Sequence, residues 1–499
     1  MITAEKTKIS STNTVFLSSQ IFHDKFKRHV DLEVFSDTNA ANQNTNNADT
    51  TIYVCGSEDD KKGIECYCDD RELTCWKGLK DANIKPILEN FILQDVFLME
   101  INITVLQKDK IFPGNENSIK KLSFYDAKII QIDIQAFDKF ISLNYLTLAK
   151  NLLKHIDENV LTQQLGSTLL TLDLAFNNLT FHDLSMFKYM VNLEELNLHG
   201  NIQRNGKIES KFPESLSNLK KLKLGECGLT DLDEHVFDNL RFYLIIAIIN
   251  EEIVFRQLET LRLHHNNFVT IPSAISSLSN LVFLGFDGNQ IESINKESFV
   301  LNTNLEEIMF TESLKLKYVG DCAFCYLPNL KFVDFWHSNN LTYMHENAFG
   351  AISVGVAPTL KEFDIEDCNV SVLPENLVNW KLIPKLSLNH NPFACNCSMA
   401  WLFNDLLSNN SIYGDKLYSL RDAYHHNKFK LGCLGPPPTT PNHTHPYTIV
   451  EIFASCKIST FSNTVWHFFT FAIFMIIFVS LLIYARQSKL AANWYTHMT

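Results

Sequence analysis

The chain has 499 residues, 46% of them hydrophobic and 20% charged, and its formal net charge is −13 at pH 7. A single compact domain of this length is unusual, but a solenoid has no upper size because each repeat contacts only its neighbours. The acidic charge argues against a nucleic-acid partner, since nucleic acids select basic surfaces.

Residues 1–54 are rich in Asn, Thr, Ser and Asp and show no sustained periodicity, so we predict a disordered segment there. The longest apolar run near the first methionine covers residues 15–17, which is much shorter than the core of a signal peptide. Without a signal peptide, a C-terminal anchor would leave the rest of the chain in the reducing cytosol, where the cysteine caps described below would not form disulfides. We therefore expect a wrong start codon or a missing first exon in preference to a cytosolic protein.

Residues 55–92 form a predicted N-terminal cap that contains Cys55, Cys66, Cys68 and Cys75. The end of a solenoid exposes an apolar cross-section, which a cap must cover. Disulfides in such a cap require an oxidising compartment. A zinc site is the alternative, but no His and no second close Cys pair completes a tetrahedral set.

Leucine-rich repeats are predicted over residues 93–394. The stretch from Leu258 to Phe268 has apolar residues at positions 1, 4, 6 and 11 and Asn266 at position 9, which is the leucine-rich repeat signature. Leu258, Leu261 and Leu263 are expected to point into a core while the residues between them face outward.

Eleven copies of this pattern follow one another, and we number them repeats 1 to 11. Their first positions are Ile119, Leu143, Leu169, Leu193, Leu219, Leu258, Leu281, Leu305, Leu330, Leu360 and Ile383. Position 9 is Asn in six of them, at Asn151, Asn177, Asn201, Asn266, Asn289 and Asn391. Cys227 and Cys368 take that position in two others and are interpreted as buried core thiols. In repeats 8 and 9 an extra residue before the turn is expected to place Leu314 and Asn339 there.

The step between repeats 5 and 6 is 39 residues, far longer than the usual 20 to 29. Deleting residues 242–256 would restore a regular repeat, and the Phe, Ile, Tyr and Asn bias of this segment suits translated AT-rich DNA. We predict an insertion from a retained intron or a gene-model error. The alternative is an apolar loop that a partner covers.

A second cysteine cap is predicted over residues 395–456, with Cys395, Cys397, Cys433 and Cys456. A juxtamembrane stalk, residues 457–464, leads to an apolar run without Asp, Glu, Lys or Arg at residues 465–484, which fits one transmembrane helix. Arg486 and Lys489 follow, so residues 485–499 are expected to be a cytoplasmic tail. This tail is too short to form a catalytic domain.

Seven N-glycosylation sequons precede the predicted span, as an extracellular assignment requires. Six are predicted acceptors: Asn102, Asn178, Asn340, Asn369, Asn409 and Asn442. The seventh, Asn396, lies between two cap cysteines and is expected to be sterically blocked.

With its repeats flanked by Cys55–Cys75 and Cys395–Cys456, the chain resembles the extracellular leucine-rich-repeat-only membrane proteins of animals. Chaoptin, connectin, tartan, capricious and nematode surface receptors of the same plan belong to this group. The resemblance implies the disulfides Cys55–Cys68, Cys66–Cys75, Cys395–Cys433 and Cys397–Cys456. The pair Cys322 and Cys325 lies inside a repeat, without the context of a redox motif, so a local disulfide or two packed thiols is expected.

Side chains at positions 2, 3, 5, 7 and 8 are expected to form the concave recognition face. The candidate ligand-binding residues there are Arg262, His264, Phe283, Asp287, Met309, Phe332, Asp334, Trp336 and His337, which include types that anchor protein interfaces. Nearby acidic residues, from Glu306 to Asp367, are expected to steer a basic partner. The alternative for each residue is an ordinary solvated position. His264 and His265 are not expected to bind a metal, because adjacent strand residues face opposite ways.

No nucleophile elbow, phosphate loop or zinc-protease helix is present in the sequence, so we predict neither an enzyme nor a cofactor or metal. The predicted fold is an α/β solenoid, a leucine-rich repeat horseshoe with two cysteine caps and one transmembrane helix. The predicted function is that of a type I plasma-membrane protein that binds an extracellular protein ligand in recognition, adhesion or as a co-receptor, and signals through a membrane partner. An innate immune receptor with a separate signalling subunit and a structural protein of apical matrix are the alternatives.

Overall fold

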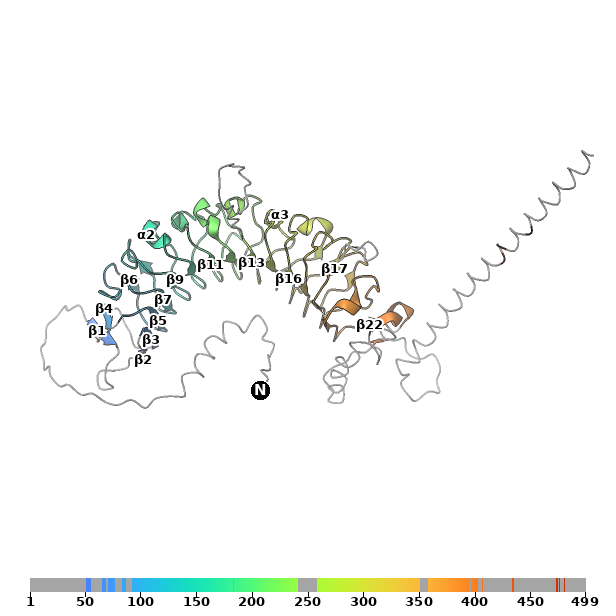
Figure 1. Cartoon of the computed structure of the whole chain (residues 1–499), viewed down its shortest axis with the longest axis horizontal. Coiled ribbons are helices and arrows are strands. Elements are labelled where there is room, and N and C mark those ends of the chain that lie inside the picture. Colours follow the sequence, from blue (N-terminus) through green and yellow to red (C-terminus); the bar gives the residue numbers. More distant parts are fainter. Residues whose placement is uncertain are drawn as a thin grey trace, which may run out of the picture.

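A computed structural model of the chain describes residues 51–54, 65–68, 71–76, 83–86, 92–182, 184–240, 258–350, 358–394, 396–402, 406, 433–434, 473, 475 and 480. The repeats form an arch whose inner side carries one long sheet (Figure 1). The predicted solenoid of about eleven turns is therefore confirmed.

The long sheet contains one short strand from each turn. In spatial order its strands are β2 (Glu65–Cys68), β3 (Glu72–Trp76), β5 (Asp95–Met99), β7 (Lys121–Tyr125), β9 (Tyr145–Thr147), β10 (Thr171–Asp173), β11 (Glu195–Asn197), β12 (Lys221–Lys223), β13 (Thr260–Arg262), β14 (Phe283–Gly285), β16 (Glu307–Met309), β18 (Phe332–Asp334), β20 (Glu362–Asp364) and β21 (Lys385–Ser387). From β3 onward, every neighbouring pair is parallel. Strand β5 belongs to a turn that precedes repeat 1 and has Ile101 at position 9 in place of Asn or Cys.

The outer side of the arch contains short elements instead of the long helices that an α/β solenoid would have. The α-helices described are single turns, α2 (Gln163–Gly166) and α3 (Ser273–Ser276). The 3-10 helices are η3 (Ser185–Phe187), η4 (Glu214–Asn218), η5 (Asp238–Leu240), η6 (Lys296–Phe299), η8 (Trp380–Leu382) and η9 (Cys397–Met399). Paired short strands are β6 (Val105–Leu106) with β8 (Gln131–Ile132), and β15 (Ser293–Ile294) with β17 (Tyr318–Val319) and β19 (Tyr343–Met344). The predicted α/β class is corrected to a β-solenoid in the described residues.

The core is a column of apolar side chains contributed equally by all turns. Leu222, Leu261, Leu284 and Ile308 are register neighbours and are fully buried. Each buried side chain of this size stabilises the fold by about 1.5–3 kcal/mol. In repeats 7 to 9, Phe replaces Leu at position 6, and the centres of neighbouring rings in the series Phe286, Phe310 and Phe335 lie about 6 Å apart.

A hydrogen-bonded ladder at position 9 connects the turns. Asn266 accepts from the backbone N–H groups of Cys227 and Leu229 and donates to the carbonyls of Leu224 and Leu263, at 2.8–3.0 Å. Asn151 forms the same set of bonds, whereas Asn177, Asn201, Asn289 and Asn391 each accept from one backbone N–H and donate to carbonyls of their own and the preceding turn. Each amide therefore satisfies three or four buried backbone groups that would be costly to leave unpaired.

The cysteines at position 9 are free and buried, as predicted. The Cys227 Sγ lies 3.4 Å from the Leu198 carbonyl, and burial raises the pKa of the Cys227 and Cys368 thiols to about 12. The prediction for repeats 8 and 9 was wrong, because Ser313 and Ser338 occupy position 9 and the extra residue follows it. Leu314 is instead 49% exposed. The Ser338 hydroxyl donates to the Phe310 carbonyl, as an Asn amide would.

The long step between repeats 5 and 6 does not interrupt the solenoid. Strands β12 and β13 pair directly, with Leu222 opposite Leu261. Residues 242–256 lie outside the described residues, so both explanations of this segment stay open.

At the N-terminal end, β2 and β3 form an antiparallel hairpin in which Cys66 lies opposite Cys75, and these two residues form a disulfide. Cys68 and Cys397 are also disulfide-bonded. Cys55, Cys395 and Cys456 lie outside the described residues, whereas Cys433 begins β23 (Cys433–Leu434), which pairs with β22 (Phe393–Ala394). A further short pair is β1 (Thr51–Val54) with β4 (Asn83–Pro86).

No helix in the described part of the chain is long and apolar enough to cross a bilayer. The predicted span over residues 465–484 falls outside the described residues except for Ile473, Met475 and Ser480, which are helical.

Candidate ligand-binding surface

The backbone displays the concave side chains in rows along the arch. Residues at positions 3 and 5 alternate with buried residues on each strand, and every position 8 described has a left-handed backbone, as at Glu226 (φ 51°), His265 (φ 51°) and His337 (φ 60°). A left-handed residue other than Gly costs about 1–2 kcal/mol, which the ladder bonds on either side offset. This turn fixes the direction in which each position-8 side chain leaves the sheet.

Repeats 6 to 9 carry the predicted aromatic and basic candidates, and all of them are partly exposed. The Arg262 guanidinium lies 4.3 Å from the centre of the Phe283 ring, a cation–π arrangement. The Trp336 and His337 rings are 5.2 Å apart. Phe332 lies on the strand of the same repeat, opposite Glu307, and Met309 lies on that neighbouring strand.

Asp287 does not belong to this exposed set, contrary to the prediction. It is 5% exposed, and its carboxylate accepts hydrogen bonds from the Thr311 backbone N–H at 2.9 Å and hydroxyl at 2.8 Å. Burial raises the pKa of Asp287. Its position-7 side chain links repeat 7 to repeat 8, so we assign it a structural role.

Carboxyl groups gather on the concave side of repeats 8 to 10. Asp334 and Asp364 are register neighbours, and each accepts a hydrogen bond of 2.8 Å from the backbone N–H two residues later. Burial and the adjacent Asp364 carboxylate raise the pKa of Asp334 to about 7. Burial likewise raises the pKa of Glu307. Burial therefore favours the protonated form of these carboxyl groups up to a higher pH than for exposed Asp and Glu side chains.

Histidines form a second cluster on repeats 4 to 6, which the sequence analysis missed. The His199 and His264 rings stack with centres 4.9 Å apart, although a whole repeat separates them. They meet because Gly225 has no side chain: a Cβ there would lie 2.5 Å from the His264 ring and 2.7 Å from His199. Burial, reinforced by His199, His265 and nearby cations, lowers the pKa of His264 to about 3. The signal was a glycine at position 7 between two position-7 histidines.

His264 and His265 also differ from the expectation that their side chains face opposite ways. His265 lies in the left-handed turn and its ring centre is 5.7 Å from that of His264. Among the described residues, no group of three or more His, Cys, Asp or Glu side chains is arranged to hold a metal.

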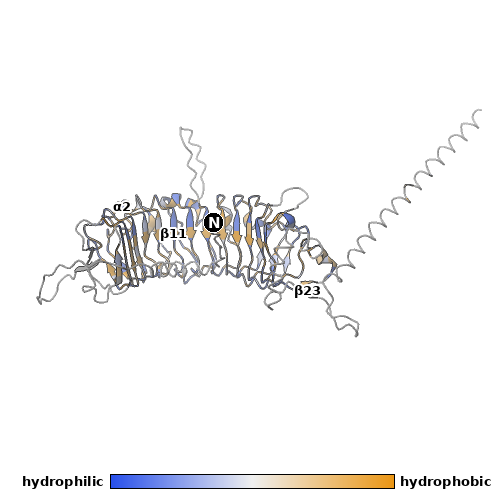
Figure 2. Ribbon diagram, turned by 60° about the horizontal axis from the view of Figure 1, so that its bottom comes forward, coloured by the Kyte–Doolittle hydropathy of each residue, from blue (hydrophilic) through white to orange (hydrophobic). Residues whose placement is uncertain are grey.

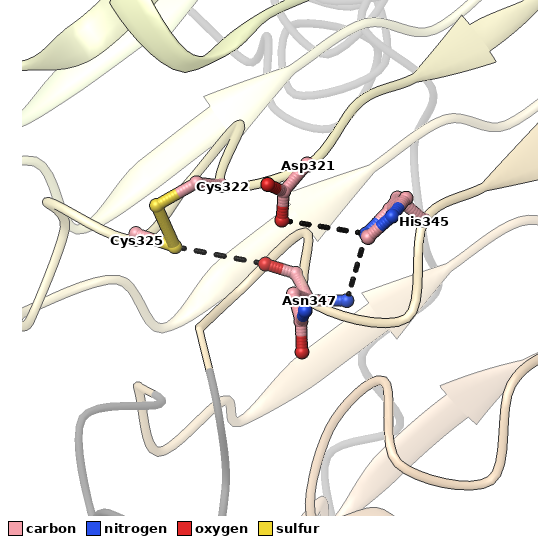
Figure 3. Close-up of a disulfide and its surroundings, with 5 residues drawn as sticks. All are labelled: Asp321, Cys322, Cys325, His345 and Asn347. Atoms are coloured by element: carbon pink, nitrogen blue, oxygen red, sulfur yellow. Dashed lines mark hydrogen bonds and ion pairs between the residues drawn. A yellow bond between two sulfur atoms is a disulfide. The ribbon is translucent and has the colours of Figure 1, made fainter.

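The CxxC pair in repeat 8 is a disulfide that links Cys322 and Cys325 (Figure 3). Cys325 Sγ lies 3.6 Å from the Asn347 carbonyl of repeat 9, and His345 Nδ1 is 3.4 Å from Asp321. These contacts connect two neighbouring turns, which favours a structural role for the bond.

The predicted glycosylation sites Asn102, Asn178, Asn340 and Asn369 are exposed. Asn396, which was expected to be blocked, is exposed as well and caps η9 by accepting from the Ser398 N–H. Asn409 and Asn442 lie outside the described residues.

Comparison with protein families shows a match to the BspA type leucine rich repeat region, in six copies over residues 108–244 and 246–355. Among curated proteins, Tsukushi of Mus musculus is 24% identical over 308 residues, which cover 58% of this chain and 85% of the relative. Lumican of Gallus gallus is 29% identical over 273 residues, which cover 47% and 77%. Among solved structures, an octameric complex of Latrophilin 3, Unc5D and FLRT2 aligns with a TM-score of 0.43 and 16% identity, covering 78% of this chain and 98% of that one. The family match and the curated relatives support a relationship to leucine-rich repeat proteins and small leucine-rich proteoglycans, and do not support the narrower chaoptin and connectin group.

Proposed function

We propose that this chain, a leucine-rich repeat protein, is a non-enzymatic binding protein that acts outside the cell and contacts a protein ligand through the concave face of repeats 6 to 10. The observation that carries the proposal is the combination of partly exposed Phe332, Trp336 and Met309 with the carboxyl group of Asp334 on adjacent strands. Aromatic and Met side chains supply the contact area of protein interfaces, and carboxyl groups select the charge of the partner.

The acidic residues of this face favour a partner with a basic contact surface. Asp334 and Glu307 are both partly exposed, and Glu307 lies beside Phe332 on the adjacent strand, whereas Asp364 is buried like Asp287. A Lys or Arg side chain of the ligand would contact both a carboxylate and an aromatic ring there. Such a contact combines charge attraction with a cation–π interaction.

The extracellular location is supported by the Cys66–Cys75 and Cys322–Cys325 disulfides, because disulfides persist in oxidising compartments. Relatives such as Tsukushi and lumican are extracellular, which agrees with this location. The proposal includes attachment to the plasma membrane through residues 465–484, with a cytoplasmic tail and a membrane co-receptor. It also includes a role in recognition or adhesion. A component of the extracellular matrix is a second candidate, which the similarity to lumican and osteomodulin favours.

Site-specific photo-crosslinking on intact cells tests the proposed surface. A benzophenone amino acid replaces Met309 in the concave face or Lys296 in η6 on the outer side. We expect covalent protein adducts from position 309 and not from position 296, and loss of those adducts when Phe332→Ala and Trp336→Ala are added. Adducts that arise equally from both positions, or that survive the double substitution, would reject the concave face.

A further inference from the structure

All strands of the long sheet from β3 onward run in the same direction, as Figure 2 shows from the inner side of the arch. The arch therefore has one flank where these strands begin and another where they end. We call the second the strand-end flank; it contains the residues that follow position 9 in each repeat.

The four exposed sequon asparagines in the repeats all lie on this flank. Asn102, Asn178 and Asn369 occupy position 10, and Asn340 is shifted by the extra residue of repeat 9; each immediately precedes a buried apolar residue. The Asn, apolar, Thr or Ser order of the sequon thus coincides with positions 10 to 12 of the repeat. Sugars attached at these sites would form one row and would leave the strand-start flank uncovered.

Asn178 is distinguished from the others by its neighbours. Leu152 and Ile202 occupy position 10 in the preceding and following repeats, and they are 50% and 64% exposed. The backbone confirms the adjacency, since the Asn178 N–H donates to the Leu153 carbonyl at 2.8 Å. Within the described residues, the Asn178 side-chain amide forms no hydrogen bond, so it is available for substitution.

We propose that Asn178 carries an N-linked glycan whose first sugars cover Leu152 and Ile202. The inference rests on the extracellular location proposed above. Neighbouring strands are about 4.8 Å apart, which is close to the width of one sugar ring, so the first sugars reach both aliphatic side chains. The glycan replaces water over an apolar pair that the fold itself leaves uncovered.

The modification is a transfer from a polyisoprenyl diphosphate-linked oligosaccharide. The bond between sugar C1 and the diphosphate oxygen breaks, a bond between C1 and Asn178 Nδ2 forms, and the amide loses one proton as the diphosphate leaves. Thr180, two residues later, completes the sequon and is exposed.

Asn102 supplies a matched control within the same row. Its neighbour at position 10 of repeat 1 is Lys128, whose ammonium group contacts the Asp126 carboxylate. Removing a sugar from Asn102 would therefore expose a charged side chain and not an apolar pair.

The test uses the full chain expressed in eukaryotic cells behind a secretory leader, with glycopeptide mass spectrometry and binding of an apolar fluorescent dye. We expect Asn178 to be occupied, and we expect Thr180→Ala to raise dye fluorescence about two-fold through the newly exposed patch. Thr104→Ala, which removes the sequon of Asn102, should leave the fluorescence unchanged. Adding Leu152→Ser and Ile202→Ser to Thr180→Ala should restore the original value.

Two results would overturn the inference: an unoccupied Asn178 in the secreted protein, or equal dye binding by the Thr180→Ala and Thr104→Ala variants. If Thr180→Ala prevents folding, Asn178→Gln, which removes the same sequon and keeps Thr180, replaces it in the comparison with Thr104→Ala. The leader supplies export here, so failure of the extracellular location would appear in the intact-cell experiment and not in this one.

Discussion

Repeats 4 to 6 and repeats 8 to 10 have the same backbone arrangement but differ in the side chains of the core, the ladder and the concave face. The first group has Leu at position 6, Asn201 and Asn266 in the ladder, and stacked neutral histidines on the concave side. The second has Phe at position 6 in repeats 8 and 9, Ser313 and Ser338 in the ladder, and paired carboxyl groups on the concave side. The period of the repeat sets the backbone, whereas single positions within it set the local hydrogen bonding and the response to pH.

The largest expected difference lies in the ladder. Asn266→Ala would leave two buried N–H groups and two carbonyls without the partner they have now, so we expect a loss of about 4 kcal/mol in the free energy of unfolding. Ser338→Ala removes one donated and one accepted bond and should cost about half as much. Urea denaturation followed by circular dichroism measures both.

Ser313→Ala is the control for the ladder, because the Ser313 hydroxyl has no hydrogen-bond partner among the described residues and its removal should be nearly neutral. Equal losses for the three ladder variants would show that position 9 acts through packing and not through hydrogen bonds.

The next effect concerns the histidine stack. Gly225→Ala would place a methyl group where the His199 and His264 rings lie, and we expect a cost of about 1–3 kcal/mol from the displaced rings. At Gly285, the nearest atom to an added Cβ is a Phe283 ring carbon at 3.3 Å, so Gly285→Ala should cost less. Thermal unfolding measures the midpoints of the two variants. Equal midpoints would contradict the claim that the His199 and His264 rings need the space at Gly225.

Asp334→Asn tests the carboxyl region through pH. The folded-state pKa of about 7 lies above the ordinary value of 3.8, so the folded chain holds the Asp334 proton more tightly, and this stabilisation is lost as the pH rises from about 4 through 7. Asn does not titrate, and its amide oxygen can accept the Trp336 N–H as Asn197 accepts that of His199. We expect the free energy of unfolding of the variant to increase relative to that of the wild type as the pH rises from 4 to 8. A constant difference across this range would contradict the raised pKa.

The smallest effect has the opposite sign and concerns His264→Gln. Because burial lowers the pKa of His264 to about 3, the unfolded chain binds the proton first, and wild-type stability is lost as the pH falls from 6.5 toward 3. Replacing the imidazole should make the decrease in the free energy of unfolding between pH 7 and 5.5 smaller by about 1 kcal/mol. Urea unfolding of the wild type and the variant at pH 7 and 5.5 measures this decrease, with His390→Gln on the exposed face as the control. A decrease in the variant as large as in the wild type would contradict the prediction.

Much of the fold could be predicted from the sequence because the repeat fixes burial residue by residue. Leucines at positions 1, 4 and 6 and asparagines at position 9 have a single role each and are buried as predicted, except Leu386 of repeat 11, which is partly exposed. Ser313 and Ser338 were missed because a serine carries no distinctive signal, while the adjacent Leu314 and Asn339 look more like the consensus. The short outer segments were harder still, since several sequences can return the chain to the next strand.

The concave face was less predictable because its side chains depend on neighbours from other repeats. Asp287 looked exposed by position, but Thr311 of the next repeat covers it with hydrogen bonds. The contact between His199 and His264 depends on Gly225, 39 residues before His264. Such relations become visible only when the repeats are stacked in register.

The central claim, a binding solenoid that matures outside the cell, is tested most directly by alkylating the thiols of the natural protein under denaturing, non-reducing conditions. Mass spectrometry should find Cys227 and Cys368 alkylated, while Cys66, Cys75, Cys322 and Cys325 stay protected as disulfides. Alkylation of Cys66 and Cys75 in the natural protein would contradict the account, because it would place the repeats in a reducing compartment.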